Sequence, residues 1–514
     1  MPHVIILGAG HNGLVASILL ARAGLTVTVI EERSQVGGAC KTEYPFASAP
    51  KLGCSTGAYL LGLMPPELMS EIGLELPLMR RDPHYFLPTP GERFLLVGSD
   101  ASALRRQFVE FFSEADWSAH LAMNKELAAI RDDLAPAWLQ PPLTLEETAE
   151  RFIRGPLRQA FADLCRGSAR EYLERFGFRS DLVKAMYAVT DAFSGLDGGY
   201  DTPGTGMNLL VHNMCRLPNS DGTWMVVQGG MGTVTRRLAD LAQRAGVSIR
   251  LGEPVTAVEV EGNAAKAVRL ASGERLGAET LVCNADPFRA LGLIPDPQFS
   301  PEYRARIEGL RTDGSTLKVN LCLKQLPRFS CLSRGGTPLG ATIHLLPDED
   351  IVLAELERGY RQMKRGNLPE FPAIEWYIHT AADGSLRDEE GRHSSALFVQ
   401  WVPYQLSGTS WDAQEQRYVN QLLAICDRFA PGTTALVQET FVLTPPKIEQ
   451  HFGISRGHIH HVDNKFGFAD RVPYRTPLQG FYFCGAGCHP AGSVIGAAGH
   501  NAAKLVLEDM GLRS

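Results

Sequence analysis

A glycine-rich turn near the N-terminus is the feature that most constrains the fold of this chain. The turn reads Gly8-Ala9-Gly10-His11-Asn12-Gly13 and follows the short apolar run His3–Leu7. Its glycine spacing suits a tight turn, a close approach of the backbone to a diphosphate, and close packing of a helix on a strand. A helix over about residues 12–23 and an apolar strand over residues 25–30 complete the pattern. The opening therefore predicts a Rossmann-type β-α-β unit.

An acidic residue ends the second predicted strand. Glu31 lies 23 residues after Gly8, close to the spacing of about 20 residues at which a carboxylate binds ribose hydroxyls. The helix N-terminus that begins near Asn12 presents free backbone N–H groups to phosphates. Together these features predict a dinucleotide cofactor, although the fingerprint alone does not separate FAD from NAD.

The stretch after Glu31 continues the predicted cofactor site. Gly37 and Gly38 let the backbone approach the cofactor, and Arg33 reaches its phosphates or its adenine edge. The alternative for Arg33 is a surface ion pair with Glu31 or Glu32. The predicted contacts in this stretch are Glu32, Arg33, Gly37, Gly38 and Ala39.

Two further glycine clusters follow strand-like runs. Residues 229–232 (Gly-Gly-Met-Gly) lack the full triplet, and the next strand, residues 247–251, does not end in an acid. A separate NAD(P)H site is therefore not expected there. Residues 484–496 lie between a strand over residues 480–483 and a helix that runs to about residue 510. Such a loop brings a helix N-terminus to an electron-rich flavin ring.

The pattern changes along the chain in a way that predicts interleaved domains. Residues 99–154 contain no glycine, and a capping-box motif at Thr144 to Glu147 indicates a helical region. Strand, glycine turn and helix then return after residue 221 and again after residue 478. We predict a discontinuous dinucleotide-binding domain over residues 1–65, 221–290 and 478–514, and a substrate domain over residues 66–220 and 291–477 with a helical, lid-like part at about 99–220.

Composition excludes several classes of function. The 514 residues carry a net charge of −7, so no global positive field attracts nucleic acid. No stretch approaches the roughly 20 apolar residues of a membrane-spanning helix, and the first strand leaves no room for a signal peptide, which predicts a cytoplasmic protein. The ten cysteines include no Cys-x-x-Cys pair, so neither a disulfide framework nor a metal site is expected.

The motifs in this order resemble the phytoene desaturase superfamily of FAD-dependent oxidoreductases, which is related to the amine oxidases. The resemblance covers nearly the whole chain, and within the superfamily it is strongest to the pyridine nucleotide-disulfide oxidoreductase domain-containing protein 2 branch. The superfamily motifs are residues 8–13, 31–38, 228–232 and 485–490, and the branch motifs are residues 401–404, 443–446 and 496–503.

This resemblance implies an α/β fold in which a Rossmann-type FAD-binding domain is interleaved with a mixed α+β substrate domain, as in amine oxidases and phytoene desaturases. It places the backbone of Val255 at the adenine, and Gly485, Val494 and Ile495 near the flavin. The branch name suggests a redox disulfide, but the sequence has no Cys-x4-Cys dithiol near the FAD motif, so disulfide reduction is not expected.

The resemblance also implies a reaction class. Relatives desaturate, saturate or isomerise long apolar molecules, mostly polyenes and isoprenoids, by hydride transfer to or from flavin N5. We therefore expect an FAD-dependent oxidoreductase with a hydrophobic substrate, an acceptor such as oxygen or a quinone, and possible peripheral contact with a membrane. The alternatives are an FAD-retaining interaction protein without turnover and an amine oxidase-like enzyme.

Few residues present themselves as acids or bases near the flavin. His489 stands before a proline, where turn packing is the commoner role than catalysis. His458, His460 and His461 lack an evident fourth metal ligand, which favours an exposed loop over a metal site. Cys40 and Cys488 are expected to be buried and inert. No catalytic residue is assigned from the sequence.

Overall fold

A five-stranded parallel sheet carries the glycine-rich turn. In the computed structural model, which describes residues 2–295, 297–332 and 338–512, this sheet has the order β17-β11-β1-β2-β7. Its neighbouring strands all run parallel, which confirms the predicted Rossmann-type α/β class. The strands are β1 (His3–Leu7), β2 (Thr26–Glu31), β7 (Ser248–Leu251), β11 (Thr280–Cys283) and β17 (Phe481–Phe483).

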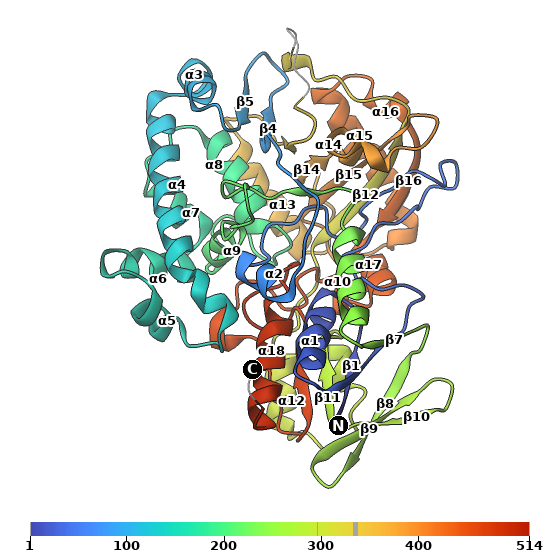
Figure 1. Cartoon of the computed structure of the whole chain (residues 1–514). Helices are drawn as coiled ribbons and strands as arrows, with labels where there is room; N and C mark the ends of the chain where they lie inside the picture. The colour runs from blue at the N-terminus through green and yellow to red at the C-terminus, as the bar shows by residue number, and fades with distance from the viewer. Residues whose placement is uncertain (1, 296, 333–337, 513–514) are drawn as a thin grey trace.

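Helix α1 (His11–Arg22) packs against the sheet and against two helices from distant parts of the chain. These are α10 (Gly232–Arg244) and α18 (Ala497–Asp509), which flank α1 in Figure 1. Glycines permit the close approach: a Cβ at Gly13 would lie 2.3 Å from the Gly8 carbonyl oxygen, and one at Gly499 would lie 2.0 Å from the Asn12 carbonyl oxygen. The glycine spacing therefore serves helix–strand packing, as predicted.

A seven-stranded sheet forms the second large layer (Figure 1). Its order is β16-β12-β15-β14-β13-β4-β5, and its pairs are antiparallel except for the parallel pair of β13 with β4. The strands are β4 (Tyr85–Pro88), β5 (Phe94–Val97), β12 (Thr316–Leu323), β13 (Thr342–Leu345), β14 (Ala373–Tyr377), β15 (His393–Gln400) and β16 (Val437–Leu443).

The stretch between β5 and α10 is largely helical, as its glycine-free beginning predicts (Figure 1). Thr144 and Glu147 form the expected capping box. This region packs on its own apolar core, which includes Phe108, Ile130 and Phe161. Its helices are α3 (Ala101–Phe111), α4 (Glu114–Leu134), α5 (Leu145–Phe152), α6 (Arg158–Arg166), α7 (Ala169–Glu174), α8 (Asp181–Tyr187), the π-helical turn η3 (Ala188–Phe193) and α9 (Thr205–His212).

Smaller elements complete the chain. The short strands are β3 (Leu78–Met79) and β6 (Val226–Val227), which pair with each other, and β8 (Val255–Glu261), β9 (Ala264–Leu270) and β10 (Arg275–Gly277), which form a three-stranded sheet. The remaining α-helices are α2 (Pro66–Ile72), α11 (Pro287–Leu291), α12 (Pro301–Glu308), α13 (Val352–Lys364), α14 (His379–Ala382), α15 (Trp411–Phe429), α16 (Thr433–Leu436) and α17 (Pro445–Phe452).

The core around the parallel sheet extends past the predicted domain limits. It includes Leu68 and Met69 of α2, and Phe299 and Ile307 at α12. The domain boundaries given under Sequence analysis therefore remain a prediction.

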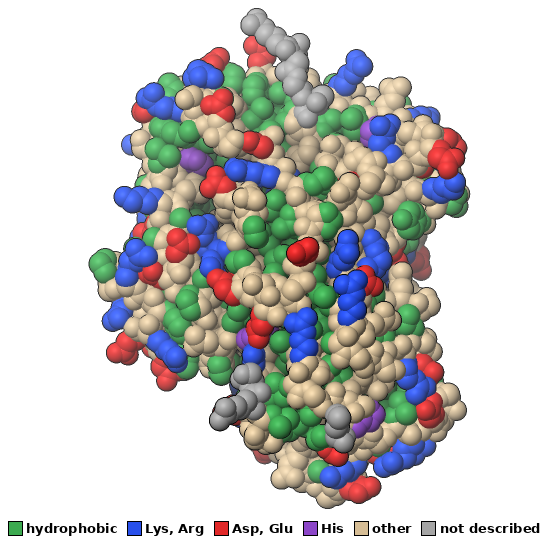
Figure 2. All heavy atoms as spheres, in the orientation of Figure 1, with side chains coloured by type: hydrophobic (Ala, Val, Ile, Leu, Met, Phe, Trp, Pro, Cys, Tyr) green, Lys and Arg blue, Asp and Glu red, His purple; other side chains and the backbone are tan. Residues whose placement is uncertain are grey.

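Charge is mixed over the surface. On the face shown in Figure 2, acidic and basic side chains are interspersed among polar and apolar ones. Within the described residues, no helix combines the length and the apolar character needed to cross a bilayer.

Candidate cofactor and substrate site

One large cavity, of about 680 Å³, connects the parallel sheet with the seven-stranded sheet and the helical region. Most of the predicted cofactor residues line it. They are Gly8, Gly10, His11, Asn12, Glu31, Glu32, Arg33, Gly37, Gly38, Ala39, Val255 and Val494.

Three predicted residues do not line this cavity: Gly13, Gly485 and Ile495. Gly13 lies under the turn, against Gly8. From the C-terminal loop, Ala486 and Ser493 line the cavity instead. The C-terminal loop thus reaches the cavity through Val494 itself and through Ala486 and Ser493, which are the neighbours of Gly485 and Val494.

The N-terminus of α1 opens into the cavity. Gly10 is its N-cap and provides no side-chain cap, so the first backbone N–H groups of the helix are left for another acceptor. Gly8 has a φ of +99°, which favours glycine. Asn284 fixes the turn by donating to the Gly8 carbonyl oxygen at 3.2 Å. A free helix N-terminus in a cavity wall is an anion site suited to a diphosphate.

Glu31 is buried at the end of β2 and accepts two backbone hydrogen bonds. Its Oε2 accepts from the Ala9 N–H at 2.8 Å, and its Oε1 accepts from the Arg33 N–H at 2.9 Å. Burial raises the pKa of this carboxyl above its usual value. Each carboxylate oxygen keeps a second lone pair, so Glu31 can still accept from a ribose hydroxyl in the cavity.

Arg33 forms the ion pair that was its alternative role. Its Nε lies 3.6 Å from Glu32 Oε1, and its Nη2 donates to the Gln450 carbonyl oxygen at 3.1 Å. Arg289 holds Glu32 more closely, with two hydrogen bonds of 3.0 and 3.1 Å. Arg33 still lines the cavity, and its contact with cofactor phosphates or adenine remains a prediction.

Two buried polar atoms of the fingerprint have no hydrogen-bond partner among the residues that the structure describes: His11 Nε2 and Asn12 Oδ1. Burial lowers the pKa of His11 to about 4, so its ring is neutral at physiological pH. Buried polar groups without partners carry a free-energy cost, and both residues line the cavity. With Glu31 and the open helix N-terminus, they form a set that fits a dinucleotide.

The prediction that the histidine cluster lies in an exposed loop is wrong. His458 and His460 are buried, because their segment passes between the C-terminal loop and the helical region. The His460 ring nitrogens lie 2.8 Å from the Gly492 carbonyl oxygen and 2.7 Å from that of Ser194. The Nδ1 of His461 lies 3.0 Å from Asp286 Oδ2. No candidate metal cluster occurs among the residues that the structure describes.

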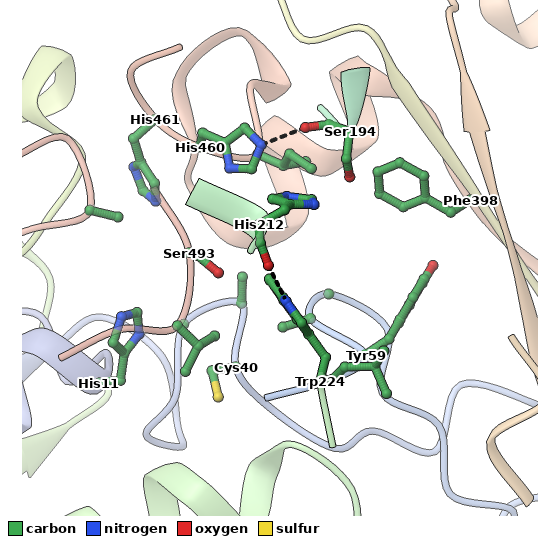
Figure 3. A pocket seen from close by; sticks show the side chains of 18 of the residues that line it. His11, Cys40, Tyr59, Ser194, His212, Trp224, Phe398, His460, His461 and Ser493 are labelled. Carbon is green, nitrogen blue, oxygen red and sulfur yellow. Dashed lines mark hydrogen bonds between the residues drawn. The ribbon is translucent and has the colours of Figure 1, made fainter. Parts of the chain in front are cut away.

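Figure 3 shows how this segment meets the cavity. In this view His11 and His461 lie on one side, Tyr59 and Phe398 lie on the other, and Ser493 and Cys40 lie between them. His489 is buried away from the cavity lining and contacts the Ala137 carbonyl oxygen at 3.1 Å. This placement matches the turn-packing interpretation of His489.

Cys40 and Cys488 are both buried, as expected. Only Cys40 lines the cavity, and burial raises the pKa of its thiol to about 12. The pKa of Cys488 is also raised by burial. Both are therefore protonated thiols near neutral pH, which matches the inert role predicted for them.

The glycines of residues 229–232 support the cofactor loop from outside the cavity. Thr42 donates its hydroxyl to the Gly229 carbonyl oxygen and accepts from the Gly232 N–H, each at 3.0 Å. The preceding strand, β6, pairs with β3 and not with the parallel sheet. This cluster therefore buttresses the segment that follows Gly38.

Sequence reasoning missed four charged residues that line the other end of the cavity. We call Arg81, Asp191, Lys318 and Glu375 the charged chamber. All four are buried. Such an accumulation of buried ionisable groups in a cavity is typical of a functional site.

The two acids of the charged chamber are held by hydroxyl groups. The Tyr85 hydroxyl donates to Asp191 Oδ1 at 2.9 Å. Glu375 accepts from the hydroxyls of Thr190 and Tyr377, the latter at 3.3 Å. Burial raises the pKa of both carboxyls to about 7, so each can take up or release a proton near neutral pH.

The two cations of the charged chamber contact neutral groups. Lys318 Nζ donates to the Gly57 carbonyl oxygen at 2.6 Å and lies 4.1 Å from the centre of the Tyr59 ring. Burial lowers its pKa to about 7. Arg81 donates to the carbonyl oxygens of Trp224 and His84 and to the Thr342 hydroxyl.

A signal for two of these residues was present in the sequence. Lys318 and Glu375 interrupt the apolar strands β12 and β14, where every residue except Tyr377 is buried. A charge inside such a strand is costly unless it has a partner or a function. Asp191 carried no comparable signal, because the π-helical turn η3 that brings it to the cavity has no sequence pattern of its own.

A third part of the cavity is apolar. Side chains of β5, α3 and α4 line it, and we call its apolar members the apolar limb: Val97, Leu104, Met123, Leu127 and Ala128. Helix α4 also contributes the polar residues His120, Asn124 and Arg131 to the lining.

Comparisons with known proteins agree with this site. The model of the flavin-containing amine oxidoreductase family matches residues 13–332. The chain is 33% identical to pyridine nucleotide-disulfide oxidoreductase domain-containing protein 2 of Mus musculus, over 98% of this chain and 93% of the relative. It is 27% identical to hydroxyneurosporene desaturase of Cereibacter sphaeroides, over 100% of this chain and 99% of the relative.

Solved structures share the fold. Putrescine oxidase bound to putrescine superposes with a TM-score of 0.56 at 16% identity, over 100% of this chain and 99% of that one. The resemblance to desaturases and amine oxidases inferred from the sequence is thus confirmed, as are FAD as the cofactor and the assignment as an enzyme. The chain belongs to the flavin-containing amine oxidoreductase family and is an FAD-dependent oxidoreductase.

Proposed function

We propose that this enzyme transfers hydride between FAD and a lipophilic, unsaturated substrate of the polyene or isoprenoid type, as a desaturase, a saturase or an isomerase. The observation that carries the proposal is the continuity of one cavity from the dinucleotide fingerprint to the apolar limb. An apolar wall with a few polar groups is the usual design of a site for a lipophilic molecule. The similarity to hydroxyneurosporene desaturase supports the same substrate class.

The residues of the chain divide the work of such a reaction. FAD, when bound, supplies a two-electron acceptor for hydride. The helix N-terminus at Gly10 and the carboxylate of Glu31 hold the cofactor, and Leu104 and Met123 of the apolar limb exclude water from the substrate. Removal of two hydrogens from a carbon–carbon bond as hydride and proton also requires a base. We assign the proton to the carboxylate of Glu375, which lines the cavity and has a pKa near 7.

Oxidation of an amine is the second candidate. The fold similarity to putrescine oxidase and the buried acids Asp191 and Glu375 favour it, because a carboxylate can hold an ammonium group. Amine oxidation with oxygen as acceptor would release hydrogen peroxide. A panel of amines therefore tests this candidate by peroxide release, and no response across the panel would exclude the amines tested.

The principal experiment is an anaerobic absorbance spectrum of the purified, FAD-loaded protein before and after addition of a lipid extract from its host. For a desaturase we expect the visible flavin band to bleach, because a lipophilic substrate delivers hydride to the flavin; for a saturase we expect the extract to restore the band of chemically reduced flavin. The depleted component of the extract then identifies the substrate. An unchanged band, with amines bleaching it instead, would contradict the proposal. Addition of oxygen or a quinone to the bleached protein identifies the acceptor.

Peripheral contact with a membrane forms part of the proposal. Val109 on α3 and Leu121 on α4 are 47% and 49% exposed, and both helices also contribute to the apolar limb. A lipophilic substrate can then enter from a lipid surface beside the limb. We expect the protein to co-sediment with phosphatidylcholine vesicles, and we expect replacement of both residues by serine to weaken that binding. Equal sedimentation of the two proteins would refute this contact.

A further inference from the structure

We propose that the charged chamber binds the carboxylate of an amphipathic substrate, with Arg81 as the anchor and the apolar limb around the hydrocarbon chain. This inference rests on the proposed function, because it names the polar end of the same lipophilic substrate. It makes the substrate a lipophilic acid and not a bare hydrocarbon.

The first observation is that Arg81 is a buried cation without a counter-ion. In the described part of the chain, its hydrogen bonds go to two backbone carbonyl oxygens and one threonine hydroxyl, and no carboxylate forms an ion pair with it. Its neighbour Arg80 differs, because it is partly exposed and pairs with Asp221 at 3.1 Å. A buried charge without a partner is strongly unfavourable. A ligand that brings a negative charge into this cavity would remove that cost.

The second observation is that Lys318 also has no carboxylate within ion-pair distance among the described residues. Its ammonium group contacts the Gly57 carbonyl oxygen and the faces of the Tyr59 and Phe398 rings. Aromatic faces stabilise a cation but do not neutralise it. Arg81, and Lys318 in its protonated form, therefore lack ion-pair partners among the described residues.

The acids of the chamber do not take that role. Asp191 and Glu375 are engaged by the hydroxyls of Tyr85, Thr190 and Tyr377. Burial disfavours the charged form of both acids and Glu375 adds to this for Asp191, whereas Arg81 and Lys318 favour the charged form of Glu375 without forming an ion pair with it. In its protonated form Asp191 is also a donor, so it can share a hydrogen bond with a bound carboxylate, and Glu375 is left as the base of the proposed reaction.

The third observation is the apolar limb, which continues from the same cavity. Leu104, Met123 and Leu127 come from two adjacent helices and present side chains without charge. A guanidinium suits the two oxygens of a carboxylate in a fork geometry. A polar end and an apolar limb in one cavity select a molecule with an acid head and a hydrocarbon chain.

Three probes of equal chain length test the inference: decanoate, decan-1-ol and decylamine, each below its micelle-forming concentration. We measure their binding to the FAD-loaded protein by isothermal titration calorimetry at pH 7. We expect decanoate to bind about tenfold or more tightly than decanol and decylamine, in line with a charge-assisted hydrogen bond. Tighter binding of decylamine, or equal binding of all three probes, would overturn the inference.

The variant Arg81→Gln tests the anchor itself. We expect its affinity for decanoate to fall about 10- to 100-fold and its affinity for decanol to stay within about threefold. The matched control is Arg80→Gln, which removes an adjacent arginine that already has a carboxylate partner, and which should bind decanoate like the wild type. Because Arg81 also holds Trp224 and Thr342, its variant can fail to fold, and the three-probe comparison on the wild type then decides.

The outcome separates this inference from the proposed function. If a neutral hydrocarbon fraction of the lipid extract bleaches the flavin while decanoate does not bind, the inference is wrong and the proposed function stands. If decanoate binds through Arg81 but no lipid fraction either bleaches the oxidised flavin or restores the band of the reduced flavin, the chamber is an acid site and the proposed hydride transfer is wrong.

Discussion

Replacement of Glu31 by glutamine tests the cofactor site most sharply. In the wild type both carboxylate oxygens accept backbone N–H groups, from Ala9 at 2.8 Å and from Arg33 at 2.9 Å. A glutamine amide has only one oxygen, so its NH₂ group would face one of these donors. The change therefore breaks one buried hydrogen bond and also removes the acceptor predicted for the ribose.

The size of the effect follows from these contacts. A buried donor left without an acceptor costs about 1–3 kcal/mol, and loss of a charged acceptor for a hydroxyl costs a similar amount. Since every 1.4 kcal/mol is about tenfold in affinity, the dissociation constant for FAD should rise about 10- to 100-fold. Part of this cost falls on the free protein, so we also expect a lower melting temperature.

The assay is the ratio of flavin to protein after gel filtration, followed by fluorescence titration of FAD into the flavin-free protein. Glu259→Gln is the control. Glu259 lies on β8 outside the cavity lining and forms surface ion pairs with Arg269 and Arg275. The control should retain FAD like the wild type. Unchanged flavin content and unchanged affinity in Glu31→Gln would refute the assignment of Glu31 to the cofactor.

Four further substitutions give distinct outcomes. Gly10→Val should lose bound FAD, measured as flavin content, because a Cβ there lies 2.8 Å from Asn284 Nδ2 and fills the diphosphate approach; a fully loaded variant would refute the turn geometry. Folding raises the pKa of Glu375 from 4.5 to about 7, so its protonation stabilises the fold at low pH and this stabilisation is lost as the pH rises to 7. Between pH 5 and pH 8, the free energy of unfolding of Glu375→Gln in urea should therefore rise by roughly 1–3 kcal/mol relative to that of the wild type. A difference that does not change with pH would contradict the assignment of Glu375 as a buried acid with a raised pKa. Folding lowers the pKa of Lys318 from 10.5 to about 7, so the free energy of unfolding of the wild type should rise between about pH 7 and 10. In the same assay Lys318→Met should lack this rise. An equal rise in both proteins would show that Lys318 is not the group responsible. Asp286→Asn should lower the free energy of unfolding by about 2–4 kcal/mol, since Asp286 caps α11 and contacts Ser455 and His461; no change in denaturant unfolding would show that these contacts are not stabilising.

The sequence predicted the β-α-β unit that carries the cofactor fingerprint because its signal is local. The spacing of Gly8, Gly10 and Gly13 and the acid at Glu31 reflect backbone geometry within a single β-α-β unit. The capping box at Thr144 is local in the same way. Each of these patterns was found where it was predicted.

The charged chamber as a whole could not be predicted from local patterns, although Lys318 and Glu375 each interrupt an apolar strand. Arg81, Asp191, Lys318 and Glu375 come from four distant segments that only the tertiary fold brings to one cavity. The histidine cluster failed for the same reason. The lack of an evident fourth metal ligand favoured an exposed loop, but the segment contacts Asp286, Ser194 and Gly492, all distant in sequence, and His458 and His460 are buried.

The central claim is that a lipophilic acid reduces the bound flavin of this enzyme. The most direct measurement separates a lipid extract of the host into neutral, acidic and basic fractions and adds each anaerobically to the FAD-loaded protein while its absorbance is recorded. The structure predicts that the acidic fraction bleaches the visible flavin band and that Arg81→Gln requires a higher concentration of that fraction. Bleaching by the basic fraction alone, or by none of the three, would contradict the account.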